Sequence, residues 1–361
     1  MKIMIISTVG LTYEGITSFI LNTIKAMDCA GLDIYIAGTI RVEESIRKQF
    51  GNLDCKIIDF PDRKKDTIRY FIELVSYIRQ NQIEVVHANG NSATLAIEML
   101  AAWIGRCKCR IAHSHNTRCN QQYTDRLLRP LFYRLYTVAL ACGEDAGRWM
   151  FGNHPFTVLN NGRDLEKYKY NPVMREEMRK RFDIGNVAVF GHVGGFVPQK
   201  NHEYLIKICA EIIKLIPEAR FFLVGDGPLR NEIERKTEEL GIKESIYFTG
   251  NIDNIDEYLQ IFDVMLFPSL YEGLPLVVLE GQLAGLNCLI SDSISDECLI
   301  SDNVKLFGLN KTPFEWAQLA IKLIENDGRA EHSVLAASEA KKKGFDIIDS
   351  SAKLRSIYTF G

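Results

Sequence analysis

Two glutamates eight positions apart, Glu272 and Glu280, are by type and spacing the best candidates for residues that bind a ligand. They stand in Tyr271-Glu272-Gly273-Leu274-Pro275-Leu276-Val277-Val278-Leu279-Glu280, after the apolar run 264–269, an order that predicts strand, loop and helix. The start of a helix offers unpaired N–H groups and partial positive charge, so it can hold an anion. A diphosphate flanked by hydroxyl-bearing groups fits this layout, with the carboxylates on the hydroxyls. On spacing alone, two solvated glutamates beside an ordinary loop fit as well.

Three further strand–loop–helix segments carry glycine loops, at 7–18, 191–202 and 224–229. Gly15 stands in the loop before the first predicted helix, and a glycine loop before a helix N-terminus can approach a phosphate or sugar closely, but the G-x-G-x-x-G fingerprint of dinucleotide sites is absent. In the second loop Gly194 precedes Lys200, whose ammonium can neutralise a phosphate. In the third, Gly225 and Asp226 can contact a base or a ribose. Each loop also reads as a plain turn, and Lys200 as a surface lysine.

Two histidines, His113 and His115, end a predicted strand at positions i and i+2, which share one face. A positioned imidazole can hydrogen-bond a sugar hydroxyl or a reacting centre, although a single histidine is usually structural. We expect no metal, because no carboxylate or further histidine lies nearby in the sequence. Of the nine cysteines, Cys107 and Cys109 form the one close pair, so neither a zinc site nor a redox role is expected.

The bulk composition is that of a globular protein. The 361 residues suit two domains, and the chain is 47% hydrophobic and 25% charged. Because no apolar run reaches bilayer length and no signal-peptide pattern opens the chain, we expect a cytoplasmic protein with reduced thiols. The net charge of −3 argues against nonspecific nucleic-acid binding.

The charge is unevenly distributed. Residues 1–164 carry 20 Lys and Arg against 16 Asp and Glu, a balance of +4, and the remainder carries −7. Arg118, Arg126 and Arg129 stand among tyrosines and leucines in and just before a helical pattern at 122–136. Such a basic amphipathic helix can rest on an anionic membrane surface. It can equally be a core helix with a solvated face.

Short apolar runs alternate with helical patterns along the whole chain. The expected strands are 2–7, 33–37, 56–60, 85–88, 110–115, 138–142 and 157–159, then 187–193, 220–224, 246–248, 264–268, 287–291 and 304–307. The expected helices include 17–30, 67–80, 92–104, 122–136, 202–216, 228–240, 255–262, 275–284, 313–325 and 347–358. This alternation predicts parallel sheets covered on both faces, with ligands at the carboxyl ends of the strands.

We therefore expect an α/β protein of two Rossmann-like, doubly wound domains facing a cleft. The turn residues Asn160-Asn161-Gly162-Arg163-Asp164 mark the hinge. The first domain is predicted to span 1–164, with a C-terminal helix at about 346–361 crossing back to it, and the second to span 165–345.

Taken in order, these segments resemble one family. The segments are His113-Ser114-His115-Asn116; Val158-Leu159-Asn160-Asn161-Gly162 with Asp164; Gly191-His192-Val193-Gly194 with Gln199-Lys200-Asn201-His202; Gly225-Asp226-Gly227; and Pro268-Ser269 with Glu272-Gly273-Leu274-Pro275 and Glu280. The chain resembles a family-four glycosyltransferase of the GT-B fold, most closely the branch that builds bacterial capsule and exopolysaccharide. The similarity runs over nearly the whole sequence.

The resemblance implies a nucleotide-sugar held mainly by the second domain. Glu272 matches the glutamate that contacts donor-sugar hydroxyls, and Glu280 the one that holds the ribose. The N–H groups of Gly273 and Leu274, with Pro275 and the helix behind it, match the diphosphate cradle, while Gly15, Gly194, Gly225 and Asp226 fall in the family's donor-binding loops. Lys200 matches the phosphate-binding lysine, and His115 the histidine near the anomeric carbon.

Members of this family retain anomeric configuration without a bound metal or other cofactor. By resemblance, the expected reaction moves a sugar from a UDP-sugar to a saccharide, lipid-linked at the cytoplasmic membrane face. One departure is Gly195, where the branch usually has an arginine on the diphosphate. The loss of such a contact raises a barrier by roughly 2–4 kcal/mol. Two alternatives therefore stay open: a weakly active or non-catalytic donor-binding partner of another transferase, and a UDP-sugar epimerase. Glu14-Gly15 also replaces the usual Gly-Gly of the first loop.

Overall fold

The computed structural model describes residues 1–12, 14–119, 121–325 and 328–360, so Tyr13 of the first glycine loop lies outside the described residues. The chain divides into two compact units, Met1–Arg163 with Gly344–Gly361 (unit 1) and Asp164–Lys343 (unit 2). The boundaries drawn from the sequence, 164 and 345, differ from this division by one and two residues.

Unit 1 is built on a fully parallel seven-stranded sheet in the order β3-β2-β1-β4-β5-β6-β7. Its strands are β1 (Lys2–Ser7), β2 (Asp33–Gly38), β3 (Lys56–Asp59), β4 (Val85–Gly90), β5 (Cys109–Ser114), β6 (Val138–Ala141) and β7 (Thr157–Val158). Its helices are α1 (Gly15–Ala26), α2 (Glu44–Gly51), α3 (Thr67–Asn81), α4 (Ala96–Ile104), α5 (Gln122–Leu135), α6 (Glu144–Phe151) and α14 (Ile347–Phe360).

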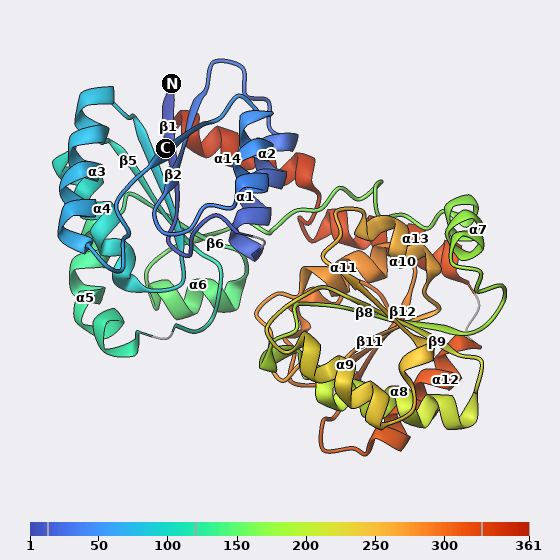
Figure 1. Cartoon of the computed structure of the whole chain (residues 1–361). Coiled ribbons are helices and arrows are strands. Elements are labelled where there is room, and N and C mark those ends of the chain that lie inside the picture. Colours follow the sequence, from blue (N-terminus) through green and yellow to red (C-terminus); the bar gives the residue numbers. More distant parts are fainter. Residues whose placement is uncertain (13, 120, 326–327, 361) are drawn as a thin grey trace. The chain divides into compact units, whose positions relative to one another are not determined.

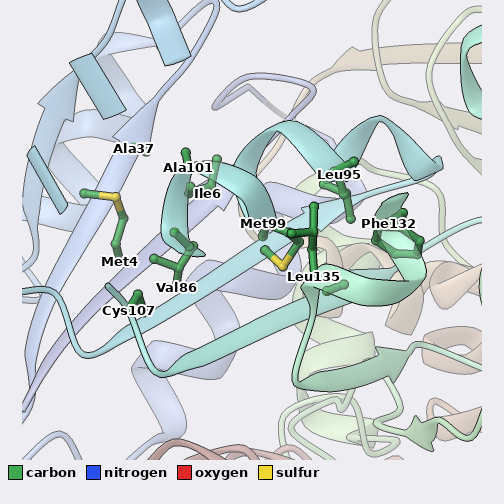
Figure 2. Close-up of a cluster of buried hydrophobic side chains, with 14 of the residues drawn as sticks. Met4, Ile6, Ala37, Val86, Leu95, Met99, Ala101, Cys107, Phe132 and Leu135 are labelled. Atoms are coloured by element: carbon green, nitrogen blue, oxygen red, sulfur yellow. The ribbon is translucent and has the colours of Figure 1, made fainter. Parts of the chain in front are cut away.

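Alternation along β1 places apolar side chains on both faces of this sheet. Met4 and Ile6 pack with residues of α3, α4 and α5, part of which Figure 2 shows. Ile3 and Ile5 enter a second buried cluster that includes side chains of α1 and α14. The strand is therefore buried on both sides, as its continuous apolar sequence predicts.

The last helix returns to the first unit. After unit 2, α14 lies beside α1 (Figure 1), and Leu354 and Tyr358 join the same buried cluster as Ile3 and Ile5. The return is fixed at its start by backbone bonds from Arg163 N to Phe345 O and from Ile347 N to Arg163 O.

Unit 2 repeats the plan with six parallel strands in the order β10-β9-β8-β11-β12-β13. The strands are β8 (Val189–Val193), β9 (Arg220–Val224), β10 (Ile246–Gly250), β11 (Val264–Phe267), β12 (Asn287–Ser291) and β13 (Val304–Phe307). The helices are α7 (Pro172–Arg181), α8 (His202–Leu215), α9 (Arg230–Glu239), α10 (Ile255–Ile261), α11 (Leu276–Leu283), α12 (Pro313–Ile324) and α13 (Arg329–Lys342). The predicted pair of doubly wound parallel sheets is confirmed.

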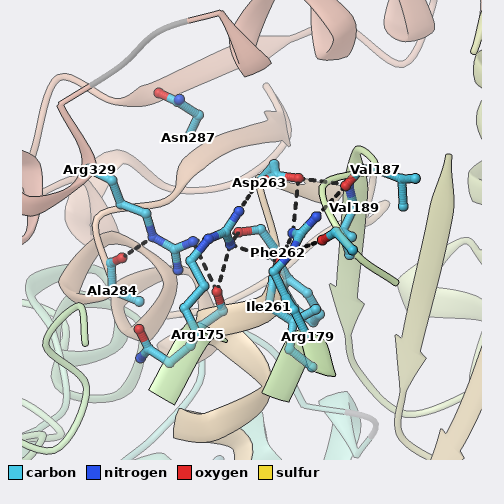
Figure 3. Close-up of polar contacts among 12 residues, drawn as sticks. Arg175, Arg179, Val187, Val189, Ile261, Phe262, Asp263, Ala284, Asn287 and Arg329 are labelled. Carbon is cyan, nitrogen blue, oxygen red and sulfur yellow. Dashed lines mark hydrogen bonds and ion pairs between the residues drawn. The ribbon is translucent and has the colours of Figure 1, made fainter. Parts of the chain in front are cut away.

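Three arginines stabilise the positions of helices α7 and α13 in unit 2 (Figure 3). Arg329, at the start of α13, donates to the carbonyls of Leu259, Gln260, Phe262 and Ala284. From α7, Arg175 pairs with Asp263 at 2.5 Å, and Arg179 donates to carbonyls at both ends of the 185–187 turn. Guanidinium groups thus satisfy the carbonyls at the carboxyl end of α10, where a helix favours positive charge.

Candidate functional site

The strand order of unit 2 creates a switch point between β8 and β11. These strands are neighbours, but the chain leaves β8 toward β9 and leaves β11 toward β12, in opposite directions. Open α/β sheets bind ligands outside the carboxyl ends of the strands at such a point. The loops that follow these two strands carry Lys200 and Glu272, which are 72 residues apart in the sequence.

Lys200 and Glu272 form a largely buried ion pair. Lys200 Nζ lies 2.7 Å from Glu272 Oε1, and the two side chains are 17% and 8% exposed. The other carboxylate oxygen of Glu272 accepts a hydrogen bond of 2.9 Å from Gln199 Nε2. Leu270 N also donates to Gln199 O, at 2.8 Å, so the two loops are joined through backbone as well as side chains. Glu272 is therefore the centre of a small polar network rather than a solvated glutamate.

The stem of Lys200 passes over Gly194. A Cβ built on Gly194 would lie 3.0 Å from Lys200 Cδ and 3.1 Å from His192 Nε2, so a side chain there would crowd both groups. The ammonium also lies 4.7 Å from the ring centroid of Phe267, a cation–π contact. Gly194 is thus a place where the backbone must stay open beside the charged end of Lys200. By contrast, a Cβ on Gly195 would meet only Asp226 O, at 3.4 Å.

The loop after β9 supports this arrangement through its backbone. Gly225 has φ +132°, and a Cβ there would lie 2.2 Å from Gly194 O, so only glycine fits. Asp226 accepts from Phe196 N through its carbonyl and from Gly227 N through Oδ1. Its other carboxylate oxygen lies 3.6 Å from an Arg230 Nη. The side chain of Asp226 is therefore engaged within its own loop and α9.

The loop after β11 leads into α11 as the sequence predicts. Gly273 and Leu274 are partly exposed, and α11 begins after Pro275, which offers no side-chain cap. The first N–H groups of such a helix have no acceptor within the helix itself. Glu280 lies in the second turn and is 7% exposed, with contacts of its own. The second glutamate is thus buried at the start of the helix, not solvated.

Several buried polar atoms near this edge have no hydrogen-bond partner among the described residues, among them His192 Nε2, Ser269 Oγ and both ring nitrogens of His202. Nδ1 of His192 lies 2.9 Å from Leu266 O and so carries the proton, which leaves Nε2 as an acceptor beside Gly194. Burial, followed by the neighbouring His202, holds the pKa of His192 well below its usual range. His192 and Ser269 were not predicted as site residues, although both stand beside strand-end glycine or proline residues.

Unit 1 brings the two strand-end histidines together. The rings of His113 and His115 are 4.1 Å apart, and both lie 5.0 Å from Phe19 of α1. His115 Nε2 is 2.8 Å from Asn89 Oδ1, on the neighbouring strand β4. Burial, followed by the nearby His87, lowers the pKa of His115 to about 3, so its imidazole is neutral at physiological pH.

A chain of buried hydrogen bonds runs beneath these rings. Tyr358 Oη of α14 lies 2.7 Å from His87 Nδ1, and His87 Nε2 lies 3.1 Å from His113 Nδ1. Burial lowers the pKa of His87 to about 3 and that of His113 well below its usual range. Asn89, His87 and Tyr358 were all missed in the sequence. The available signal was the polar run Asn89-Gly90-Asn91-Ser92 after an apolar strand.

The remaining residues of unit 1 that the sequence predicts for the site are Gly15, Arg118, Arg126 and Arg129. Gly15 opens α1 after Glu14, in open space. Arg126 is exposed on α5. Arg129 is instead held by Asp125, at 2.7 Å, and by the hydroxyl of Tyr133. Arg118, before α5, has contacts of its own. Of these three arginines, Arg129 is therefore committed to contacts inside its unit.

Neither a metal-binding cluster nor a membrane-spanning helix is present in the described ranges. No three His, Cys, Asp or Glu side chains gather there in a way that could hold a metal ion. Nor does any helix in those ranges have the length and apolarity to cross a membrane.

Comparisons with known proteins agree with the fold. Residues 174–343 match the family model of glycosyl transferases group 1. EpsF of Bacillus subtilis (strain 168), named as a glycosyltransferase, is 38% identical over 233 residues, which are 61% of this chain and 60% of EpsF. UDP-Gal:alpha-D-GlcNAc-diphosphoundecaprenol alpha-1,3-galactosyltransferase of Escherichia coli is 24% identical over 88% of this chain and 84% of its own length.

Solved structures share the whole architecture. HepE of Anabaena, crystallised in complex with UDP, superposes with a TM-score of 0.81 at 18% identity, covering 99% of this chain and 100% of HepE. WaaG, a glycosyltransferase involved in lipopolysaccharide biosynthesis, covers the full length of both chains with a TM-score of 0.72 at 14% identity. The predicted GT-B fold is thereby confirmed.

Proposed function

From the match of residues 174–343 to the family model of glycosyl transferases group 1, we propose that this chain is a retaining glycosyltransferase of that family. Its donor is a UDP-sugar, and its acceptor is a saccharide carried on a lipid, in the synthesis of capsule or exopolysaccharide. HepE was crystallised with UDP, and the Escherichia coli relative is named for UDP-galactose and a diphosphoundecaprenol-linked sugar.

The pairing of Lys200 with Glu272 at the switch point is the observation that carries the proposal. A cation and a carboxylate lie 2.7 Å apart beside the start of α11. The cation suits the diphosphate of a nucleotide-sugar, and the carboxylate suits the hydroxyls of its sugar. In the proposed complex the diphosphate accepts from Lys200 and from the N–H groups of Gly273 and Leu274. Glu272 accepts from hydroxyls of the sugar, and Glu280 from those of the ribose.

The reaction follows from this placement. The bond between the anomeric carbon and the diphosphate oxygen breaks, and the bond to the acceptor oxygen forms on the same face of the sugar. The acceptor proton passes to the departing phosphate oxygen, and UDP leaves. Lys200 and the N–H groups stabilise the negative charge that grows on the diphosphate, which is the electrostatic term that dominates most enzymatic rate enhancements.

We propose that the protein supplies this positive charge and that no metal or other cofactor takes part. The donor set at the switch point is an ammonium, backbone N–H groups and a helix start, and these bind phosphate directly. Transfer measured with EDTA is then expected to equal transfer without it. A rate restored only by added Mg²⁺ or Mn²⁺ would contradict this.

The test is turnover of a panel of UDP-sugars with three variants, Glu272→Gln, Lys200→Ala and His115→Ala. We expect each to lose at least roughly 100-fold in kcat/KM, since each removes a polar contact to the reacting groups. Lys207→Ala is the matched control, because this lysine of α8 is solvent-exposed and pairs only with Glu203. Near-normal rates in all three site variants would end the proposal.

Gly195 supports a second candidate, a weakly active or non-catalytic donor-binding protein. A Cβ built on Gly195 would meet Asp226 O at 3.4 Å, and glycine itself supplies no charge, so the diphosphate has one charged contact fewer than in relatives with an arginine there. Strong turnover by the native chain would exclude this candidate. An epimerase, the other alternative, would release a free epimer from the UDP-sugar alone, and product analysis without acceptor decides that point.

We also propose that α5 rests on an anionic membrane surface, where a lipid-linked acceptor is found. Tyr123, Leu127 and Leu131 recur on one exposed face of this helix and are 95%, 77% and 40% exposed, with Arg126 exposed beside them. Apolar side chains flanked by arginine suit the boundary between lipid headgroups and acyl chains. The protein would then work at the cytoplasmic face of the membrane.

A further inference from the structure

We propose that Asn89 is a positioning residue that holds His115 in the tautomer protonated on Nε2, so that Nδ1 accepts a hydrogen bond from a hydroxyl of the bound saccharide. This inference rests on the proposed function for the identity of the ligand. The state of the ring itself rests on contacts within unit 1 alone. Asn89 of β4 thereby has a role at the site, and His115 Nδ1 is the acceptor of the hydrogen bond from the saccharide.

The orientation of the Asn89 amide is fixed by its two ends. Its nitrogen lies 3.3 Å from Ile6 O and 3.4 Å from His87 O, and both of these atoms can only accept. The amide oxygen must therefore be the atom that faces His115, at 2.8 Å from Nε2. Since a carbonyl oxygen cannot donate, Nε2 carries the hydrogen. Asn89 is fully buried, so water does not compete for these bonds.

The other ring nitrogen is left available. His115 Nδ1 is buried and has no hydrogen-bond partner within the described parts of the chain. With the hydrogen on Nε2, this nitrogen holds a lone pair and can only accept. A buried acceptor without a partner is costly, and a hydroxyl donor from a ligand removes that cost.

Neighbouring side chains hold the ring in this orientation and keep it neutral. Phe19 of α1 lies on one side and His113 of β5 on another, at 5.0 and 4.1 Å between centroids. Among the described residues, His113 and His87 are the titratable groups near His115, with Tyr358 behind them, and none of these three is an acid near neutral pH. Because burial lowers the pKa of His115 to about 3, the acceptor persists across the physiological range.

The ring state is measurable without any assay of transfer. The chain has seven histidines, so ¹⁵N-histidine labelling with long-range ¹H–¹⁵N correlation gives a short spectrum, in which His115→Gln identifies the His115 signals. We expect a pure Nε2–H pattern in the native protein and a mixture of tautomers in Asn89→Leu. A Nδ1–H pattern in the native protein, or an unchanged pattern in Asn89→Leu, would overturn the inference.

Kinetics test the consequence. Asn89→Leu is expected to lower kcat roughly 10- to 100-fold, as when a group orienting an active-site histidine is lost, with KM for the donor changed far less. Asn89→Asp keeps an acceptor at Nε2 but raises the pKa of His115, so it should work at pH 8.5 and fail as the pH falls toward 6. Native kcat in Asn89→Leu would refute the role, as would equal losses at every pH in both folded variants.

Asn52→Leu, at an exposed asparagine of unit 1, is the control for the Asn-to-Leu substitution itself. It should give the histidine spectrum and the kcat of the native chain. If the native protein transfers no sugar from any UDP-donor, the proposed function fails. The tautomer spectra of the native and Asn89→Leu proteins then still decide whether Asn89 sets the state of His115.

Discussion

Removing one partner of the Lys200–Glu272 pair should destabilise unit 2 far more than removing both. In Lys200→Met, Glu272 stays 8% exposed and, among the described residues, keeps the side-chain hydrogen bond from Gln199. At 2.7 Å and an effective dielectric constant of about 20, the lost attraction is about 6 kcal/mol. The desolvation of the lysine is recovered at the same time, and measured costs of breaking buried pairs are roughly 3–5 kcal/mol. We expect a loss of about 3 kcal/mol, because the lysine is not fully buried.

The double variant Lys200→Met with Glu272→Gln should recover most of this loss, to within about 1 kcal/mol of the native chain, since no unpaired charge remains. Urea unfolding reports the difference through Trp316, a fully buried residue of the unit 2 core. Replacing Trp103 and Trp149 of unit 1 by phenylalanine makes the fluorescence specific for unit 2. Lys207→Met, which breaks an exposed pair, should cost less than about 0.5 kcal/mol.

Two results would refute this reasoning. If the urea concentration at the unfolding midpoint of Lys200→Met equals that of the native chain, the ion pair does not stabilise unit 2. If the single and double variants lose the same free energy, the coupling between the two charges is absent, and the loss comes from packing of the lysine stem.

The other predictions concern four separate features. Gly195→Arg should raise kcat roughly 10-fold or more in a UDP-sugar transfer assay, because it adds a cation where a Cβ has room; an unchanged rate would mean that the diphosphate does not approach this loop. Arg329→Met should cost unit 2 about 3 kcal/mol in urea unfolding, because it removes hydrogen bonds to four carbonyls, of which those of Gln260 and Phe262 keep Arg175 as a donor. Leu127→Glu should abolish binding to anionic vesicles in a flotation assay, while Leu335→Glu, at a similarly exposed leucine of α13, should leave it intact. Unit 1 should lose stability as the pH falls from about 6.5 toward 3: the folded-state pKa of His87 is lowered to about 3, and those of His113 and His115 are lowered too, so the unfolded chain takes up these protons first, at up to about 1.4 kcal/mol per pH unit for each histidine. In urea titrations His87→Gln should remove the share of one histidine from that slope.

The strands were predictable because each is a short, almost wholly apolar run. β1, β9, β12 and β13 have the predicted bounds, since charged or turn residues stop each run sharply. Helices with little apolar content were not predicted, namely α2, α6, α7 and α13. In α7 and α13 the stabilising groups are Arg175, Arg179 and Arg329, and each has at least one carbonyl partner far away in the sequence.

The candidate site was predictable in its residue types and not in its contacts. The loops with Lys200 and Glu272 can be recognised in the sequence, because glycine, proline and charged residues follow a strand there. That the two side chains touch depends on β8 lying next to β11, which spacing does not reveal. Asn89 was missed for the same reason: its partner His115 follows a neighbouring strand, and a buried asparagine in a strand has no signature of its own.

The return of α14 to unit 1 has a consequence for synthesis. All of unit 2, residues 164–343, is translated between the other elements of unit 1 and the helix that completes their core. At roughly 5–20 residues per second, this stretch takes on the order of 10–40 s. During that time the apolar side chains of α1 and β1 await Leu354 and Tyr358. The first unit to emerge from the ribosome is therefore the last to finish folding, and it is the one that a chaperone would have reason to hold.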